Sequence, residues 1–261
     1  MSTPVSARQR RHTERRAARL AAERVAAARA TRRRRLGLLG AAALLAAALV
    51  AVAAALSSSG ARSTEGAAAL GGREAAALFA GIPERDGVLG DPRAPLTLTD
   101  YVDLQCPVCA ESSAATLPTI VRDYVRTGKV RLEVRTLHFL GPDSDRAARV
   151  AAGADRQNRL FRFLDVFYAN QGTENTGYVT DAFLRSVARA AGVDAGRAMG
   201  QAGSTFATGR IARADADAAR LGVTGTPTLA LARGNGTSRV LAVSPLDPTA
   251  VAHALDAELA R

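Results

Sequence analysis

The two cysteines of this 261-residue chain, Cys106 and Cys109, lie three positions apart in the segment DYVDLQCPVCA. Pro107 follows the first of them, and proline favours the first turn of a helix because its missing N–H is not needed there. Apolar residues then recur at helical spacing as far as about Arg126, with a kink expected at Pro118. We therefore expect a helix whose first turn contains Cys106, with Cys109 one turn further along.

The segment before the cysteines has the alternation of a strand. Leu96, Leu98 and Val102 share one parity, and Asp100 falls on the same face as these apolar side chains. The carboxyl group of Asp100 is therefore expected to point inward. The alternative is a strand-end carboxylate that reaches water.

The remaining segments extend this unit into an α/β fold. Residues 130–137 alternate apolar and charged side chains, as in a half-solvated strand, and residues 144–220 are helical throughout, with Thr180 as an N-cap. Two apolar runs flank the Asn-Gly pair at 235–236, which is a strong hairpin pattern, and Asp247 caps a last helix. The predicted order is β-α-β, then a helical block, then β-β-α.

The N-terminal part carries nearly all of the net charge. Residues 1–35 hold twelve Arg and two Glu, which account for +10 of the formal net charge of +11. Residues 36–56 are an uncharged, apolar run of 21 residues, long enough as a helix to span about 30 Å of hydrocarbon. Because Arg-rich flanks stay in the cytoplasm, we expect a basic cytoplasmic tail, a transmembrane anchor and an exported C-terminal domain.

Two alternatives exist for these N-terminal segments. A cleaved signal peptide is one, since Ala53–Ala55 offer small residues to a peptidase, but secretory apolar regions usually run only about 7–15 residues. The Arg-rich tail can bind anionic lipid or nucleic acid, but a solvated topology signal is the simpler interpretation, so no nucleic acid partner is expected. Residues 57–78, rich in Ala, Gly and Ser, are predicted to form a flexible linker to a domain at 79–261.

Three kinds of chemistry compete for the cysteine pair. A structural disulfide across four residues removes only about 2 kcal/mol of unfolded-state entropy, so the pair is a poor staple. Zinc needs two further ligands, and His138 and His253 lack the spacing of a zinc half-site. Redox exchange fits best, because the start of a helix stabilises a thiolate at Cys106 and Cys109 can close on it. No metal or other cofactor is expected.

The segment DYVDLQCPVCA, the preceding GIPERDGVLGDPRAPLTLT and the later VTGTPT together resemble a membrane-anchored DsbA-like thiol:disulfide oxidoreductase. The resemblance covers about residues 79–261. It implies a thioredoxin-like fold with an inserted helical subdomain at about 143–220, preceded by one N-terminal transmembrane helix. It also implies an enzyme that forms or exchanges disulfides in exported proteins, held in the cell membrane with its N-terminus in the cytoplasm.

The resemblance assigns roles to five of the candidate residues. Cys106 is implied to be the exposed nucleophile and Cys109 the buried resolving thiol, while Asp100 matches a buried acid that exchanges a proton with Cys109. Thr226 and Pro227 match a cis-proline loop that binds a substrate strand through its backbone.

Further residues lie around the pair. Pro107 and Val108, between the cysteines, are implied to contact the substrate. Well-studied oxidases of the family have His where this chain has Val108, and an isopropyl group cannot stabilise a thiolate as an imidazole does, so strong oxidising power is not implied. Asp103 and Gln105 either line the approach to the pair or serve only as a turn residue and a helix-cap neighbour.

The implied partners are exported proteins with free thiols and a membrane quinone-linked thiol oxidase of the DsbB or vitamin-K-epoxide-reductase-like kind. Two other functions stay open at this point. One is an envelope disulfide reductase or isomerase fed by a membrane electron donor. The other is a non-enzymatic thioredoxin-like module that binds extended peptide through the Pro227 loop.

Overall fold

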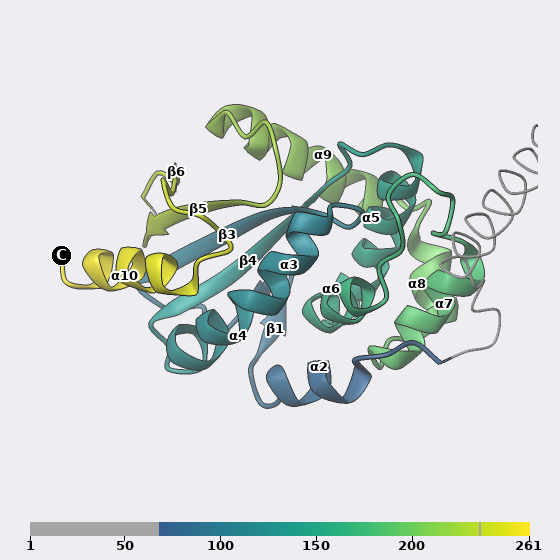
Figure 1. Cartoon of the computed structure of the whole chain (residues 1–261), viewed down its shortest axis with the longest axis horizontal. Helices are drawn as coiled ribbons and strands as arrows, with labels where there is room; N and C mark the ends of the chain where they lie inside the picture. Colours follow the sequence, from purple (N-terminus) through teal and green to yellow (C-terminus); the bar gives the residue numbers. More distant parts are fainter. Residues whose placement is uncertain (1–67, 235) are drawn as a thin grey trace, which may run out of the picture. The chain divides into compact units, whose positions relative to one another are not determined.

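The computed structural model describes residues 68–234 and 236–261, which form one sheet with helices on both faces (Figure 1). Within these residues, no helix is both long enough and apolar enough to cross a membrane. The predicted basic tail at 1–35, the predicted membrane helix at 36–56 and the start of the predicted linker lie outside the described residues.

The sheet sets the position of the cysteine pair. In the described residues its six strands follow the order β1-β2-β4-β3-β5-β6. Strand β3 pairs in parallel with β4 and antiparallel with β5, so the ends of β3 and β4 and the start of β5 meet at one edge. The strands are β1 (Glu84–Arg85), β2 (Val88–Leu89), β3 (Leu96–Asp103), β4 (Val130–Leu137), β5 (Thr228–Arg233) and β6 (Arg239–Val240).

The helices confirm the predicted order of elements, but the block predicted to be helical throughout from 144 to 220 is interrupted by a non-helical segment at 170–180. A β-α-β unit comes first, a helical block separates β4 from β5, and the β5-β6 hairpin precedes the last helix. Thr180 and Asp247 both cap helices with their side chains, as predicted. The helices are α2 (Gly72–Leu78), α3 (Pro107–Ala115), α4 (Leu117–Ile120), the π-helical turn η1 (Val121–Val125), α5 (Pro142–Asp155), α6 (Leu160–Ala169), α7 (Asp181–Ala190), α8 (Ala195–Gln201), α9 (Thr205–Leu221) and α10 (Pro248–Leu259).

The helix predicted to run from Cys106 to about Arg126 is interrupted rather than kinked. It stops at Thr116, two residues before Pro118, and resumes as α4 and η1. Pro118 has no N–H with which to continue the α-helical ladder, which accounts for the break. The Ser112 and Thr116 hydroxyls both donate to the Pro245 carbonyl, at 3.0 and 2.6 Å, and so fix the end of α3.

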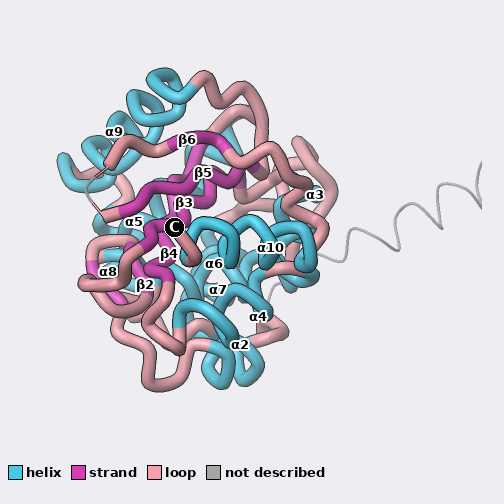
Figure 2. The backbone as a smooth tube through the Cα atoms, turned by 90° about the vertical axis from the view of Figure 1, so that its left-hand side faces the viewer, coloured by secondary structure: helices cyan, strands magenta, loops and turns pink. Residues whose placement is uncertain are grey.

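Strand β3 sends its side chains to two apolar layers. Leu98 and Val102 lie in the main core, which Phe161 of α6 joins. Tyr101, on the opposite face, packs against Ala214 of α9 in a separate cluster. Figure 2 shows α9 on one side of the strands and α4 and α10 on the other, which agrees with this division. The predicted parity of β3 is therefore confirmed.

Helix α2 lies in the stretch predicted to be linker. Its Ala75 is completely buried in the main core, and Phe79 directly after it packs on Phe161 with ring centroids 6.0 Å apart. The Ala-rich sequence of α2 has no apolar periodicity to mark it. Its small side chains allow close packing against α6, so the packed structure begins before residue 79.

Candidate active site at the cysteine pair

Cys106 occupies the boundary between strand and helix. It is the N-cap residue of α3, with extended backbone angles of φ −71° and ψ 116°, and Pro107 takes the first helical position. Its carbonyl accepts hydrogen bonds from the N–H groups of Cys109 and Ala110, at 3.1 and 3.3 Å. The first helical turn therefore closes over the Cys106 carbonyl, as the sequence predicts.

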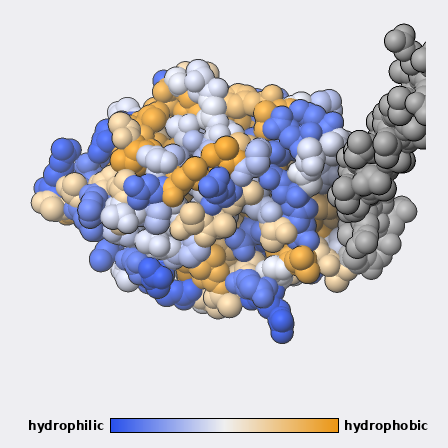
Figure 3. Space-filling view, in the orientation of Figure 1, coloured by the Kyte–Doolittle hydropathy of each residue, from blue (hydrophilic) through white to orange (hydrophobic). Residues whose placement is uncertain are grey.

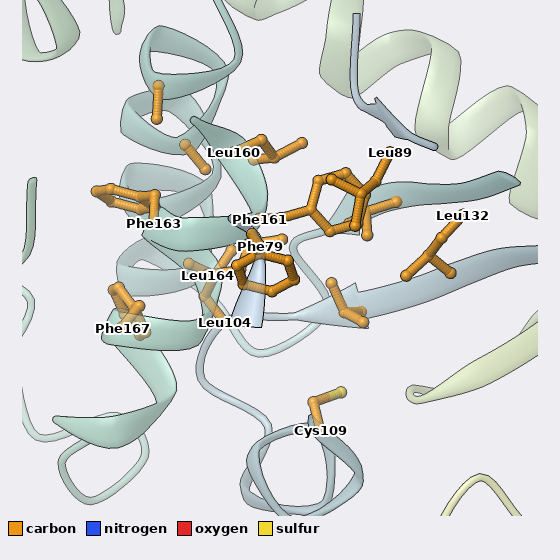
Figure 4. Packing of buried hydrophobic residues seen from close by; sticks show 14 of the residues in the cluster. Phe79, Leu89, Leu104, Cys109, Leu132, Leu160, Phe161, Phe163, Leu164 and Phe167 are labelled. Atoms are coloured by element: carbon orange, nitrogen blue, oxygen red, sulfur yellow. The ribbon is translucent and has the colours of Figure 1, made fainter. Parts of the chain in front are cut away.

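Cys109 lies one turn further and belongs to the core. Only 1 % of it is exposed, and Figure 4 shows it beside the apolar cluster that contains Leu104 and Phe161. Both thiols are free in this structure. Cys109 therefore lies in the apolar interior. Cys106 lies at the edge of the sheet where β3 and β4 end and β5 begins.

The two thiols have opposite electrostatic environments. A hydrogen bond from the Cys109 side chain is the largest influence that lowers the pKa of Cys106 to about 6, and the Thr226 side chain and the N–H groups of Cys109 and Val108 act in the same direction. Burial raises the pKa of Cys109 far above its ordinary value, and the hydrogen bond it donates to Cys106 adds to this. Near neutral pH the pair thus holds one thiolate and one thiol.

The loop before β5 covers Cys106. The Thr226–Pro227 peptide bond is cis, as the resemblance implies, and the Cys106 Sγ donates to the Thr226 carbonyl at 3.4 Å. Burial opposes the ionisation of Cys106, but the interactions named above outweigh it and keep its pKa lowered. Cys106 is only 6 % exposed, so the expectation of an exposed nucleophile is wrong in degree, because the loop lies directly over the sulfur.

Asp100 faces inward, as its parity in β3 predicts. Its Oδ1 atom is fully enclosed and has no hydrogen-bond partner among the described residues. Burial raises the pKa of the Asp100 carboxyl to about 7. Asp100 as a whole is half-buried, so the alternative of a strand-end carboxylate that reaches water through its other oxygen stays open.

Asp103 and Gln105 serve the simpler of the two roles considered for them. Asp103 is completely buried, and its carboxylate accepts from the Gln105 N–H, the Leu140 N–H and the Ser144 hydroxyl, at 2.9, 3.1 and 2.6 Å. Gln105 is also buried. These side chains fix the turn between β3 and α3 against the start of α5, and they do not line an approach to the sulfur atoms.

Two residues of the helical block reach the site and carry no signal in the sequence. Tyr168 donates from its hydroxyl to the Asp103 carbonyl at 3.3 Å, and burial, followed by the nearby Cys109 and Asp100, raises its pKa well above the ordinary value. Gln171 donates to two carbonyls of the same turn, including that of Cys106. Tyr168 and Gln171 lie 62 and 65 positions after Cys106, so no local pattern connects them to it.

The exposed part of the site is apolar. Pro107 is exposed, and Val108 is 41 % exposed beside Cys106. Phe139, in the segment that follows β4, is 50 % exposed. Figure 3 shows apolar residues scattered in separate patches among polar ones on the face that it displays. Pro107 and Val108 thus place exposed apolar side chains directly after Cys106.

Metal binding has no support from the described geometry. Among the described residues, no group of three or more His, Cys, Asp or Glu side chains is placed to hold a metal ion. His138 instead pairs with Asp215 of α9, at 3.2 Å between Nε2 and Oδ2.

Comparison with protein families matches residues 84–237 to the family model described as thioredoxin. A curated relative, the probable disulfide bond formation protein D of Bacillus cereus, is 29 % identical over 103 residues, which cover 39 % of this chain and 48 % of that protein. The chain thus spans about half the length of the curated relatives that head this comparison.

Solved structures share the fold. The oxidised BdbD of Bacillus subtilis superposes with a TM-score of 0.60 at 18 % identity, covering 67 % of this chain and 94 % of that one. The α-DsbA1 of Wolbachia pipientis gives a TM-score of 0.58 at 19 % identity, over 67 % of this chain and 91 % of the other. The predicted thioredoxin-like architecture with a helical insertion is confirmed by these likenesses.

Proposed function

This chain belongs to the thioredoxin family, and from that premise we propose that it is a thiol:disulfide oxidoreductase that forms or exchanges disulfides in exported proteins. One observation carries the proposal. Two hydrogen-bonded thiols lie at a helix start, one with its pKa lowered to about 6 and the other with its pKa strongly raised. The name of the Bacillus cereus relative, a probable disulfide bond formation protein, agrees with it.

The proposed reaction starts from the oxidised pair. A substrate thiolate attacks the Cys106 sulfur, the bond to Cys109 breaks, and Cys109 leaves with the electron pair and takes a proton. The substrate's second thiolate then attacks the substrate sulfur of the mixed disulfide and releases Cys106 as a thiolate. The substrate loses two electrons and two protons, and the enzyme pair gains the electrons.

The two pKa shifts suit different steps of this reaction. Cys106 leaves readily because its thiolate is stabilised at neutral pH, and Cys109 is a strong base once it is expelled. Asp100, whose pKa of about 7 allows it to hold or release a proton at neutral pH, is the proposed proton donor to Cys109.

The cis-proline loop and the residues between the cysteines form the proposed substrate site. Thr226 and Pro227 are half-buried, and the Thr226 carbonyl, which accepts from the Cys106 Sγ, is the backbone group proposed to bind an extended strand when Cys106 is in the disulfide. Pro107 and Val108 offer exposed apolar surface on the other side of the sulfur. Backbone hydrogen bonds from the loop and non-specific apolar contact suit substrates of varied sequence.

We place this reaction outside the cytoplasm, with the domain held by a membrane helix at 36–56. The support is the uncharged 21-residue run and the twelve Arg that precede it. A membrane quinone-linked thiol oxidase, of the DsbB or vitamin-K-epoxide-reductase-like kind, is the proposed electron acceptor that restores the disulfide. The electron balance requires an acceptor, because each turnover leaves the pair reduced, and the kind of acceptor is taken from the family resemblance.

Trapping tests the assignment of the two thiols. In the Cys109→Ser protein, Cys106 still forms a mixed disulfide but the thiol that would reverse it is gone, so adducts with exported proteins are expected to accumulate and to disappear with reductant. Cys106→Ser is the matched variant, and its remaining thiol is 1 % exposed with a raised pKa, so few adducts are expected. Equal trapping by the two variants contradicts the assignment.

A further inference from the structure

The segment after α6 makes hydrogen bonds to the turn that leads to Cys106. The side-chain amide of Gln171 donates both of its useful hydrogen bonds to backbone carbonyls of that turn, at 2.7 Å to Leu104 and 3.1 Å to Cys106. Gln171 is the second residue beyond α6 and is half-buried. The contact therefore joins the helical insertion to the N-cap of α3 across 65 positions of sequence.

Neighbouring bonds strengthen the same contact. The Asn175 N–H donates to the Gln105 Oε1 at 3.0 Å, and the Tyr168 hydroxyl donates to the Asp103 carbonyl at 3.3 Å. Donors from the insertion thus bind the turn at four consecutive residues, 103 to 106. If these bonds served only to stabilise the fold, they would not need to reach every residue from 103 to 106.

We propose that Gln171 is a positioning residue of the redox site, whose amide fixes the Cys106 carbonyl and so holds the first turn of α3 against the Cys106 sulfur. The inference rests on the proposed oxidoreductase function. The Cys106 carbonyl already accepts from Cys109 and Ala110, and Gln171 is its only bond from outside α3 among the described residues. Fixing this carbonyl fixes the peptide that begins α3.

The physical link runs from the carbonyl to the thiolate. Interactions with the backbone N–H groups of Cys109 and Val108, at the start of α3, favour the ionised form of Cys106. Their direction depends on the first helical turn, and that turn depends on the orientation of the Cys106–Pro107 peptide. A turn that moves more freely directs these donors at the sulfur for a smaller fraction of the time.

Gln171→Met tests the proposal in the full-length reduced protein, because methionine keeps the length of the side chain and removes its donors. Thiolate absorbance at 240 nm between pH 4 and 9 reports Cys106, since the chain has two cysteines and the pKa of Cys109 is raised beyond that range. The titration midpoint is expected to rise by about 0.3–1 unit, a two- to tenfold loss of thiolate stabilisation. The equilibrium with glutathione is expected to shift toward the disulfide by the same factor.

Gln157→Met is the matched control. Gln157 is also half-buried in the insertion, and its amide also donates to two backbone carbonyls, those of Gly153 and Asp194, at 3.3 and 3.2 Å. In the described part of the chain its hydrogen bonds go to Gly153 and Asp194 and not to the turn at 103–106, so its loss is expected to reduce stability and leave the Cys106 midpoint unchanged. Gln171→Asn keeps the amide on a shorter side chain, so it is expected to shift the midpoint less than Gln171→Met. This variant tests the proposal if Gln171→Met does not fold.

The outcomes separate this inference from the proposed function. If Gln171→Met loses as much stability as Gln157→Met but titrates like the wild type, Gln171 is structural only and the inference is wrong. If the wild-type pair does not exchange with glutathione at all, the proposed function is wrong. The absorbance titration still reports the positioning of Cys106 in that case, because it needs no exchange reaction.

Discussion

Replacing Asp100 by Asn is expected to stabilise the protein at neutral and alkaline pH. The carboxyl lies on the core face of β3 with one oxygen enclosed and unpartnered, so its charged form is poorly solvated. Asn has nearly the same shape and hydrogen-bonding atoms but no charge. The substitution therefore isolates the free-energy cost of burying the ionised carboxylate.

The size and sign of the effect follow from the pKa of Asp100. Burial raises it from 3.8 to about 7, so folding disfavours ionisation between these values. A shift of about three units corresponds to at most about 4 kcal/mol of free energy, and because Asp100 is only half-buried, solvent screening makes the effect smaller. Because the folded-state pKa is raised, wild-type stability is undiminished below pH 4, falls relative to Asp100→Asn as the pH rises to 7, and differs by a constant amount above that.

Denaturant unfolding followed by circular dichroism from pH 3.5 to 8.5 measures this difference. Cys106 titrates in the same range, but it does so in both proteins and cancels from the comparison. Asp91→Asn is a control of opposite sign, because hydrogen bonds from Arg93 lower the pKa of that exposed carboxyl. A stability difference for Asp100→Asn that stays flat from pH 4 to 8 refutes the claim that the buried carboxylate is poorly solvated. Slower formation of mixed disulfides by Asp100→Asn is also expected if Asp100 supplies the proton to Cys109 as that thiolate leaves.

Two further predictions concern the potential and the topology. Val108→His is expected to add one charge-assisted hydrogen bond to the Cys106 thiolate, worth about 1.5–3 kcal/mol, and so to raise the redox potential by about 30–65 mV in glutathione buffers. An unchanged or lower potential means that position 108 does not reach the sulfur. A reporter that works only outside the cytoplasm is expected to be active after Arg261 and inactive before Arg32, and the reverse pattern contradicts the proposed export.

Much of the fold follows from local pattern. The parity of β3, the helix that begins with a Cys-Pro pair and the capping by Thr180 each depend on a few adjacent residues, so the sequence predicts them correctly. Helix α2 was missed because its packing relies on small side chains, which have no periodicity. The break at Thr116 differs from the expected kink at Pro118 because the effect of a proline extends to the turn before it.

The site is only partly accessible to such reasoning. The cysteines, Asp100 and the cis-proline loop were identified from local pattern and resemblance, but the depth at which Cys106 lies under Thr226 depends on packing between distant segments. Tyr168 and Gln171 could not be found, because a single Tyr or Gln in a helical block has no distinguishing neighbours. A side chain that binds a backbone carbonyl can come from any position in the chain, so no spacing pattern in the sequence marks it.

The central claim is that Cys106 and Cys109 form one reversible two-electron pair. Equilibration with glutathione buffers, followed by alkylation and mass analysis of the intact chain, tests it most directly. The account predicts a single transition in which both thiols disappear together, with a potential between the about −270 mV of thioredoxin and the about −120 mV of DsbA. Persistent glutathione adducts without an internal disulfide, or a pair that stays oxidised below about −300 mV as a structural disulfide does, contradict it.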